Sequence, residues 1–248
     1  MQRLGLFFII AFITMGWAML QQSPGLIKTC FLVLVIIGII GEFFYVSFAK
    51  HRRSVIVTKF LEAGDVDRFL AEIEKDIEKE KSKVYKDMLL VNKTAGLYYM
   101  GRSREAVRIL DEIKIVKLPK LFRYLYYNNR MANLILDERI NEAQELVDKN
   151  PEVFKMTDKP SLINHAMQGN LAALAFHQGD HEKSRVMLEG LLRVKRSRFY
   201  AAATHLYLGS IELKKGNTDE AKAHLTEASQ AAPATYIAER AQRLLTMV

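Results

Sequence analysis

Apolar residues from Val55 onward recur at the spacing of an amphipathic α-helix. They fall at positions i, i+3, i+4 and i+7, and a turn interrupts the pattern about every 14 to 20 residues. The alternation of a β-strand never persists, and proline is almost absent from the predicted helices. The pattern therefore predicts an all-α chain of short consecutive helices.

The turns between these helices return at a nearly fixed interval. Gly64 and Gly101 are 37 residues apart, and so are Gly179 and Gly216. The middle gap of 78 residues leaves room for one more copy, in which Glu138 replaces the glycine. This period is typical of arrays of helical hairpins, where each unit buries its apolar face against its neighbours. Such an array favours a binding protein over an enzyme.

The clearest copy runs from Ala202 to Pro233. Its first helix contains Leu208-Gly209, and the inner face of its second helix is predicted to hold Ala221, Leu225 and Ala228. This copy resembles the tetratricopeptide repeat, whose pattern is a Leu-Gly pair, then Ala-x3-aromatic, then Pro. It departs from that pattern at His205 and Glu212, where the family usually has aromatic residues. The resemblance covers about residues 50–248 and implies an α-solenoid with a concave groove.

The same register predicts about four to five helix pairs and a capping helix. The copies lie at about 50–83, 87–119, 124–151, 165–196 and 202–233, and the cap at 235–248. Small residues are expected where the two helices of a pair cross closely, because a large side chain would separate them. These positions are occupied by Ala106, Ala143, Ser184 and Ala221, whereas the first copy has Phe69.

Two apolar segments precede the array. The first runs from Leu4 to Leu20, and the second from Cys30 past Glu42 to Ala49. Both are close to the length of about 20 residues that a helix needs to cross a bilayer, and turn-forming residues separate them. A cleaved signal peptide is the alternative for the first segment, but no small-x-small site precedes Gln21. We therefore expect a transmembrane hairpin in residues 1–49, with helices at about 4–20 and 27–49 and a loop at 21–26.

The distribution of charge predicts where this hairpin places the chain. Basic residues flank the two segments on the side of the termini, so both termini and the repeat domain are expected in the cytoplasm of a two-span cell-membrane protein. Lys50, Arg52 and Arg53 are expected to contact lipid headgroups. Half of the net charge of +8 lies in residues 1–53, and the remainder is spread too thinly for a nucleic-acid surface. This layout resembles that of bacterial membrane-anchored tetratricopeptide proteins.

A row of asparagines is the main candidate site. Asn92, Asn129 and Asn170 occupy the same position of successive copies, and Tyr207 occupies it in the last one. In the tetratricopeptide family this position faces the concave groove, and an amide can bond both the N–H and the C=O of an extended peptide. Neighbouring residues expected in the same groove include Asn128, Tyr99 and His177. Alternatively, the asparagines face water or contact an adjacent helix.

The sequence shows no catalytic constellation and no cofactor site. It contains one cysteine, Cys30, and neither a Gly-x-Ser-x-Gly elbow nor a phosphate-binding loop. His177, Asp180 and His181 are too few and too poorly spaced for zinc, and Asp180 is expected to cap the next helix. We therefore expect a membrane-tethered adaptor that binds a protein or peptide in its groove. The alternatives are a homo-oligomeric assembly factor and a non-catalytic subunit of a membrane-bound enzyme complex.

Overall fold

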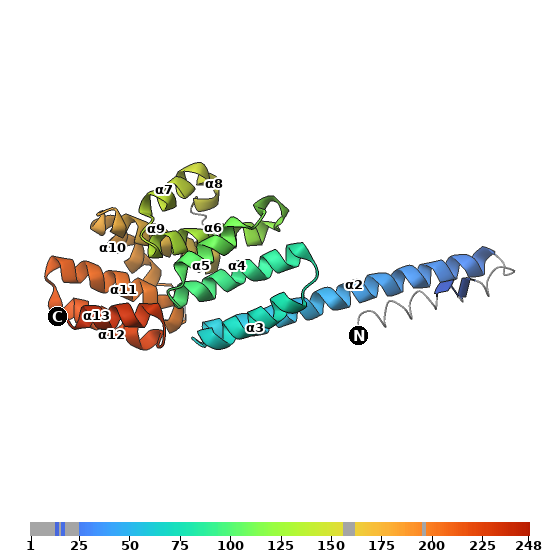
Figure 1. Ribbon diagram of the computed structural model, residues 1–248, viewed down its shortest axis with the longest axis horizontal. Coiled ribbons are helices and arrows are strands. Elements are labelled where there is room, and N and C mark those ends of the chain that lie inside the picture. Colours follow the sequence, from blue (N-terminus) through green and yellow to red (C-terminus); the bar gives the residue numbers. More distant parts are fainter. Residues whose placement is uncertain (1–12, 15, 18–24, 156–161, 195–196) are drawn as a thin grey trace. The chain divides into compact units, whose positions relative to one another are not determined.

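The computed structural model describes residues 13–14, 16–17, 25–155, 162–194 and 197–248. Helices are the only regular secondary structure among these residues, which confirms the predicted all-α class (Figure 1). The chain divides into two compact units, Met1–Ile56 and Val57–Val248. The boundary falls within helix α2, Gly25–Glu62, whose last residues belong to the second unit.

The predicted transmembrane hairpin is wrong. Across the described ranges of the chain, no helix combines the length and the apolar character that crossing a membrane requires. Residues 27–49 do not form a bounded apolar span, because α2 continues through the charged residues Lys50, Arg52 and Arg53 to Glu62. Residues 4–12 and the loop at 21–24 lie outside the described residues. The predicted two-span membrane location fails with the hairpin, whereas no observation tests the expected lipid contacts of the three basic residues.

The second unit is a helical-repeat array consistent with an α-solenoid. The end of α2 pairs with α3, and the later helices form pairs in the order of the chain. The final helix, α13, follows the last pair. The helices are α3 (Val66–Lys79), α4 (Lys83–Tyr99), α5 (Ser103–Asp111), η1 (Ile115–Lys117), α6 (Lys120–Leu136), α7 (Ile140–Lys149), α8 (Pro151–Phe154), α9 (Leu162–His177), α10 (His181–Leu192), α11 (Arg198–Lys215), α12 (Thr218–Ala231) and α13 (Tyr236–Leu245).

The same left-handed turn joins the two helices of every pair. In each turn, one residue with positive φ lies two positions before the second helix; these residues are Gly64, Gly101, Glu138, Gly179 and Gly216. Each donates its N–H to the carbonyl three residues back, and the next residue donates to the carbonyl five residues back. These bonds satisfy the free carbonyls at the helix end. Glu138 has a φ of 61°, so the predicted copy without glycine is confirmed.

The small residues lie at the predicted helix crossings. Each is the fourth residue of the second helix and is fully buried: Ala106, Ala143, Ser184 and Ala221. In the last pair, a Cβ on Gly209 would come within 2.7 Å of Leu225 Cγ, so the predicted close Leu-Gly contact is confirmed. Phe69 fits the first copy because Gly96 of α4 faces it, where an added Cβ would lie 2.8 Å from the Phe69 ring.

The first and last helices of the second unit share one hydrophobic core. This core joins Val57 and Phe69, near the start of the unit, to Phe199 and Ile237, near its end. The ring of Tyr99 on α4 lies 4.4 Å from that of Phe199 on α11, between centroids. A Cβ on Gly101 would lie 3.3 Å from Cβ of Tyr236, on α13. The array therefore closes on itself, with aromatic side chains between its first and last helices.

A pair of histidines joins α11 to α12. The two Nδ1 atoms of His205 and His224 are 3.0 Å apart and the ring centroids 5.2 Å apart, so the nitrogens point almost directly at each other. One imidazole must donate and the other accept, which requires at least one neutral ring. Burial lowers the pKa of His224, although the carboxylates of Glu212 and Glu189 partly oppose that shift. The contact therefore requires a neutral ring, and burial of His224 favours its neutral form.

We expect Glu138→Gly to stabilise the protein. Glycine adopts positive φ without a Cβ clash, although its greater freedom in the unfolded chain offsets part of the gain. The net increase in the free energy of unfolding should be about 0.5–1 kcal/mol. Urea denaturation measures it, and Glu138→Ala, which keeps the Cβ, is the matched control. Equal stabilisation by both variants would contradict the conformational explanation.

The free energy of unfolding should fall on acidification from pH 7 to pH 5, in part because of His224. Its pKa is lower in the folded than in the unfolded state, so the unfolded chain binds more protons as the pH drops through the histidine range. Protonation of both rings would also place two cations face to face, one on α11 and one on α12. His224→Gln, in which the amide can still donate to His205, should flatten this pH dependence. An identical slope in both proteins would rule out the contribution of the pair.

Candidate partner-binding site

Asn129, at the centre of the predicted row, bonds to a neighbouring helix. Its side chain is only 6% exposed. The amide nitrogen donates to the carbonyl of Val91 at 2.8 Å and to the hydroxyl of Thr94 at 3.2 Å, both on α4. This side chain therefore connects α6 to α4.

The other asparagines extend this connection to α9. Asn170 donates to the side-chain oxygen of Asn128 at 2.9 Å and to its carbonyl at 3.1 Å. Asn133, which the sequence reasoning missed, is fully buried and donates to the carbonyls of Thr94 and Asn129. Asn92 is half-buried and makes no side-chain hydrogen bond to the described residues. Peptide binding by this row stays a prediction, and two of its amides, those of Asn129 and Asn170, already bridge α4, α6 and α9.

The predicted aromatic residues of the groove lie against the helices that close the array. Tyr99 packs on Phe199, and the ring of Tyr207 lies 5.3 Å from that of Phe176 and 6.0 Å from that of His177. Burial raises the pKa of Tyr207 to about 12, so its hydroxyl stays protonated at neutral pH. Burial also lowers the pKa of His177, and the nearby charge of Arg240 lowers it further. The structure brings Tyr207 and His177 together and places Tyr99 against Phe199, and partner binding by these residues stays a prediction.

Helix α13 supplies the charged residue of this interior. The guanidinium of Arg240 donates to the hydroxyl of Tyr236, one turn earlier, at 2.7 Å. The i, i+4 spacing of these two residues was visible in the sequence. Their place beside α4 and α9 was not, because nothing in the sequence of the cap shows that it packs back onto earlier helices.

An open apolar groove lies on another side of the array, between α7 and α10. Its volume is about 540 Å³. Residues of α9 form its base, where Leu174 and Ala175 are almost fully buried, and Val186 of α10 is 59% exposed. The lining residues are Gln144, Val147, Leu171, Leu174, Ala175, Gln178, Glu182, Lys183, Val186 and Met187. We call this site the α7–α10 groove.

Most polar groups around the α7–α10 groove already have partners. Gln178, in the turn after α9, donates to the side-chain oxygen of Gln144 on α7 at 2.8 Å. Glu182 pairs with Arg185 at 2.6 Å and with Lys215 at 3.6 Å. Lys183 is exposed and forms no ion pair with the described residues. Its ammonium group is therefore the one lining charge without a counter-charge in this part of the structure.

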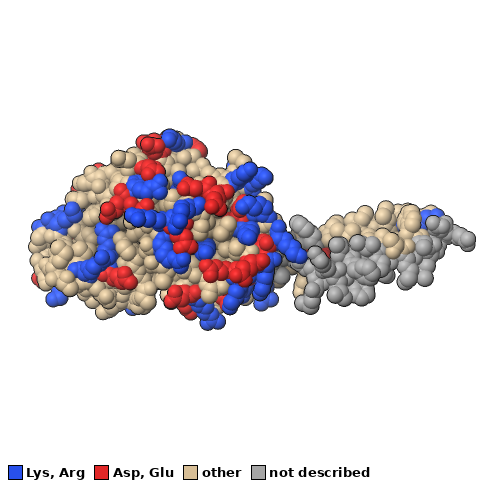
Figure 2. Space-filling model, viewed as in Figure 1, with Lys and Arg blue, Asp and Glu red and all other residues tan. Residues whose placement is uncertain are grey.

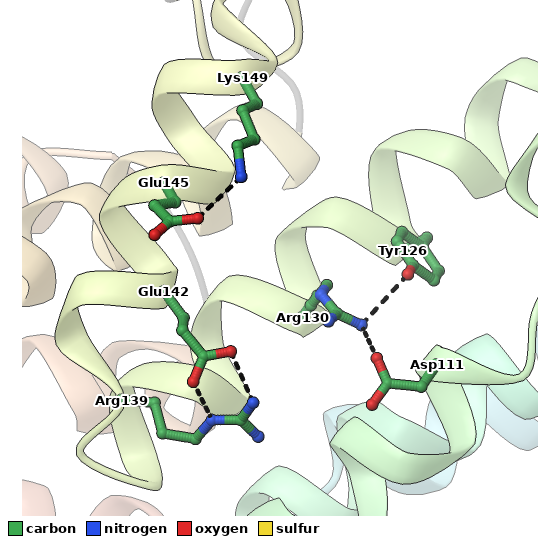
Figure 3. Close-up of polar contacts among 7 residues, drawn as sticks. All are labelled: Asp111, Tyr126, Arg130, Arg139, Glu142, Glu145 and Lys149. Carbon is green, nitrogen blue, oxygen red and sulfur yellow. Dashed lines mark hydrogen bonds and ion pairs between the residues drawn. The ribbon is translucent and has the colours of Figure 1, made fainter.

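The surface of α7 beside the groove carries charges that are paired locally. Figure 3 shows Arg139 with Glu142 and Glu145 with Lys149, each pair within one turn of the helix. The same view shows Arg130 of α6 between Asp111 and the hydroxyl of Tyr126. On the face of the repeat unit drawn in Figure 2, basic and acidic side chains intermingle, and no broad area of one sign is seen there. Charge on that face does not favour a polyanionic partner.

The α7–α10 groove is suited to non-covalent binding of apolar side chains. Among the described residues, no three His, Cys, Asp or Glu side chains gather to hold a metal ion. Asp180 caps α10 by accepting from the backbone N–H of Lys183 at 3.2 Å, so its predicted capping role is confirmed. Sequence reasoning missed the groove, because α7 and α9 come together only through tertiary packing.

Comparison with known proteins adds no relative. No family model matches the chain, and no curated protein matches its sequence. The assignment of function therefore rests on the geometry.

We expect Asn129→Ala to lower the free energy of unfolding by about 1–3 kcal/mol, because it removes two buried hydrogen bonds between α6 and α4. Asn92→Ala is the matched control from the same row and should change it by less than about 0.5 kcal/mol. Thermal and urea denaturation of both variants provide the measurement. Equal, small effects would show that the bridge adds little stability.

Proposed function

We propose that this protein is a protein-interaction adaptor that binds a segment of its partner in the α7–α10 groove. The observation that carries the proposal is the open apolar groove in an array whose inner side is closed by its own last helices. Exposing Val186 to water is unfavourable, and an apolar side chain from a partner would remove that exposure.

The architecture supports the same role. Helical-repeat arrays present extended surfaces that bind other proteins, and the clearest copy here resembles the tetratricopeptide repeat. The adaptor proposed here differs from the one expected from the sequence in having its site in the α7–α10 groove.

Val186→Asp should abolish partner binding, because a carboxylate in an apolar contact must lose its hydration. The experiment is quantitative affinity capture from cell extract with the full-length protein. Val116→Asp is the matched control, because it makes the same change at a residue that is 87% exposed on η1, and it should capture the partner normally.

A third variant separates this site from the asparagine row. Asn92→Ala changes the half-buried member of the row whose amide makes no bond to the described residues. Loss of capture with Asn92→Ala and normal capture with Val186→Asp would place binding on the row and overturn the proposal. The circular dichroism of each variant verifies that it is folded.

A further inference from the structure

Three residues along α10 define what the α7–α10 groove recognises. Lys183, Val186 and Gly190 are spaced i, i+3 and i+7, so they follow one another along one side of the helix. They present a positive charge, an exposed apolar side chain and a bare stretch of backbone. The inference rests on the proposed function: in a groove that binds a partner, this order of chemical groups indicates the class of partner.

Lys183 is placed against the preference of its own helix. It lies in the first turn of α10, where the aligned peptide dipoles already concentrate positive charge, and acidic side chains are the favoured residues. The carboxylate of the neighbouring Glu182 already forms ion pairs with Arg185 and Lys215. Asp180 caps the helix start, but the ammonium group of Lys183 forms no ion pair with the described residues and leaves a positive charge at this end of the groove. A carboxylate from a partner would be the natural counter-charge.

Gly190 has no role in the packing of the described residues. A Cβ at this position would have no described neighbour within 4 Å, whereas at Gly96 and Gly209 it would collide with side chains of adjacent helices. Glycine within a helix is less stable than alanine, so its presence here needs another reason. Close approach of a second backbone to α10 is such a reason, because the missing side chain lets the two axes come nearer.

We propose that the α7–α10 groove binds an amphipathic α-helix of a partner protein that carries an acidic residue within one turn of its apolar anchor. The apolar side chain enters the groove beside Val186 and Met187, over the base formed by α9. The carboxylate pairs with Lys183, and the partner helix crosses α10 closely at Gly190. A groove between two helices is a common receptor for such a segment, which is read by side chains at i, i+3, i+4 and i+7.

The test selects binders from a phage-displayed library of random 12-residue peptides. The full-length protein is the target, and Val186→Asp is used for counter-selection. The best peptides are synthesised with a fluorophore, and their dissociation constants are measured by fluorescence anisotropy against each variant. The proposal expects helical peptides that combine an apolar residue with Asp or Glu three or four positions away.

Lys183→Glu should weaken these peptides about fivefold or more, since it replaces an attraction by a repulsion. Lys222→Glu, the same charge reversal at an exposed lysine of α12, is the matched control and should leave binding unchanged. Gly190→Leu should weaken binding at least about tenfold by filling the close contact. Raising the salt concentration should weaken wild-type binding and strengthen binding to Lys183→Glu, because it screens an attraction in the first and a repulsion in the second.

The outcomes separate this inference from the proposed function. Peptides that depend on Val186 but lack an acidic residue, or bind Lys183→Glu equally well, would overturn the partner class and leave the adaptor role standing. Peptides matching a segment of this chain would identify a second copy as the occupant and also overturn it. Failure to select any peptide that distinguishes the wild type from Val186→Asp would overturn both.

Discussion

The packing of the first helices of the repeat unit against the last ones is the constraint on which its structure depends. A row of helix pairs could in principle continue as an open superhelix with an accessible inner side. Here Val57 and Phe69 share a core with Phe199 and Ile237, and α13 lies beside α4. Because this core is apolar and well packed, the inner side is occupied by the protein itself. Every statement about where a partner can bind follows from that closure.

The closure changes how the asparagines of the row are interpreted. An amide in an open groove is available to a peptide, but Asn129 and Asn170 lie between neighbouring helices and donate to acceptors within the array. A buried amide needs such partners, since an unpaired polar group costs more than a hydrogen bond contributes. The row therefore sets the registration of α4, α6 and α9. Tyr207, next to Arg240 and His177, has become part of an interior that the last helix completes.

The α7–α10 groove is an exposed apolar surface outside the shared core of the first and last helices. The α7–α10 groove is apolar at its base, its amides are bonded to each other, and its charges are paired except for Lys183. Gly190 reduces the stability of α10, and the exposed side chain of Val186 reduces solubility, with no evident structural benefit from either residue. These departures from local preference lie on one side of one helix. A functional surface is the place where such departures are expected to gather.

The sequence alone determined the local structure of the repeats. Period, glycine positions and small residues predicted the helix pairs, including the left-handed turn at Glu138 and the buried positions of Ala106 and Ala221, because each depends on neighbours within one or two turns of chain. It did not determine how the pairs associate: whether the array closes, which face the asparagines meet, or where α7 and α10 leave a groove. It also misled at the N-terminus, where an apolar run was interpreted as a membrane span although α2 continues through charged residues. Contacts between different helix pairs decide how the pairs associate, and a periodic pattern within each pair does not predict those contacts.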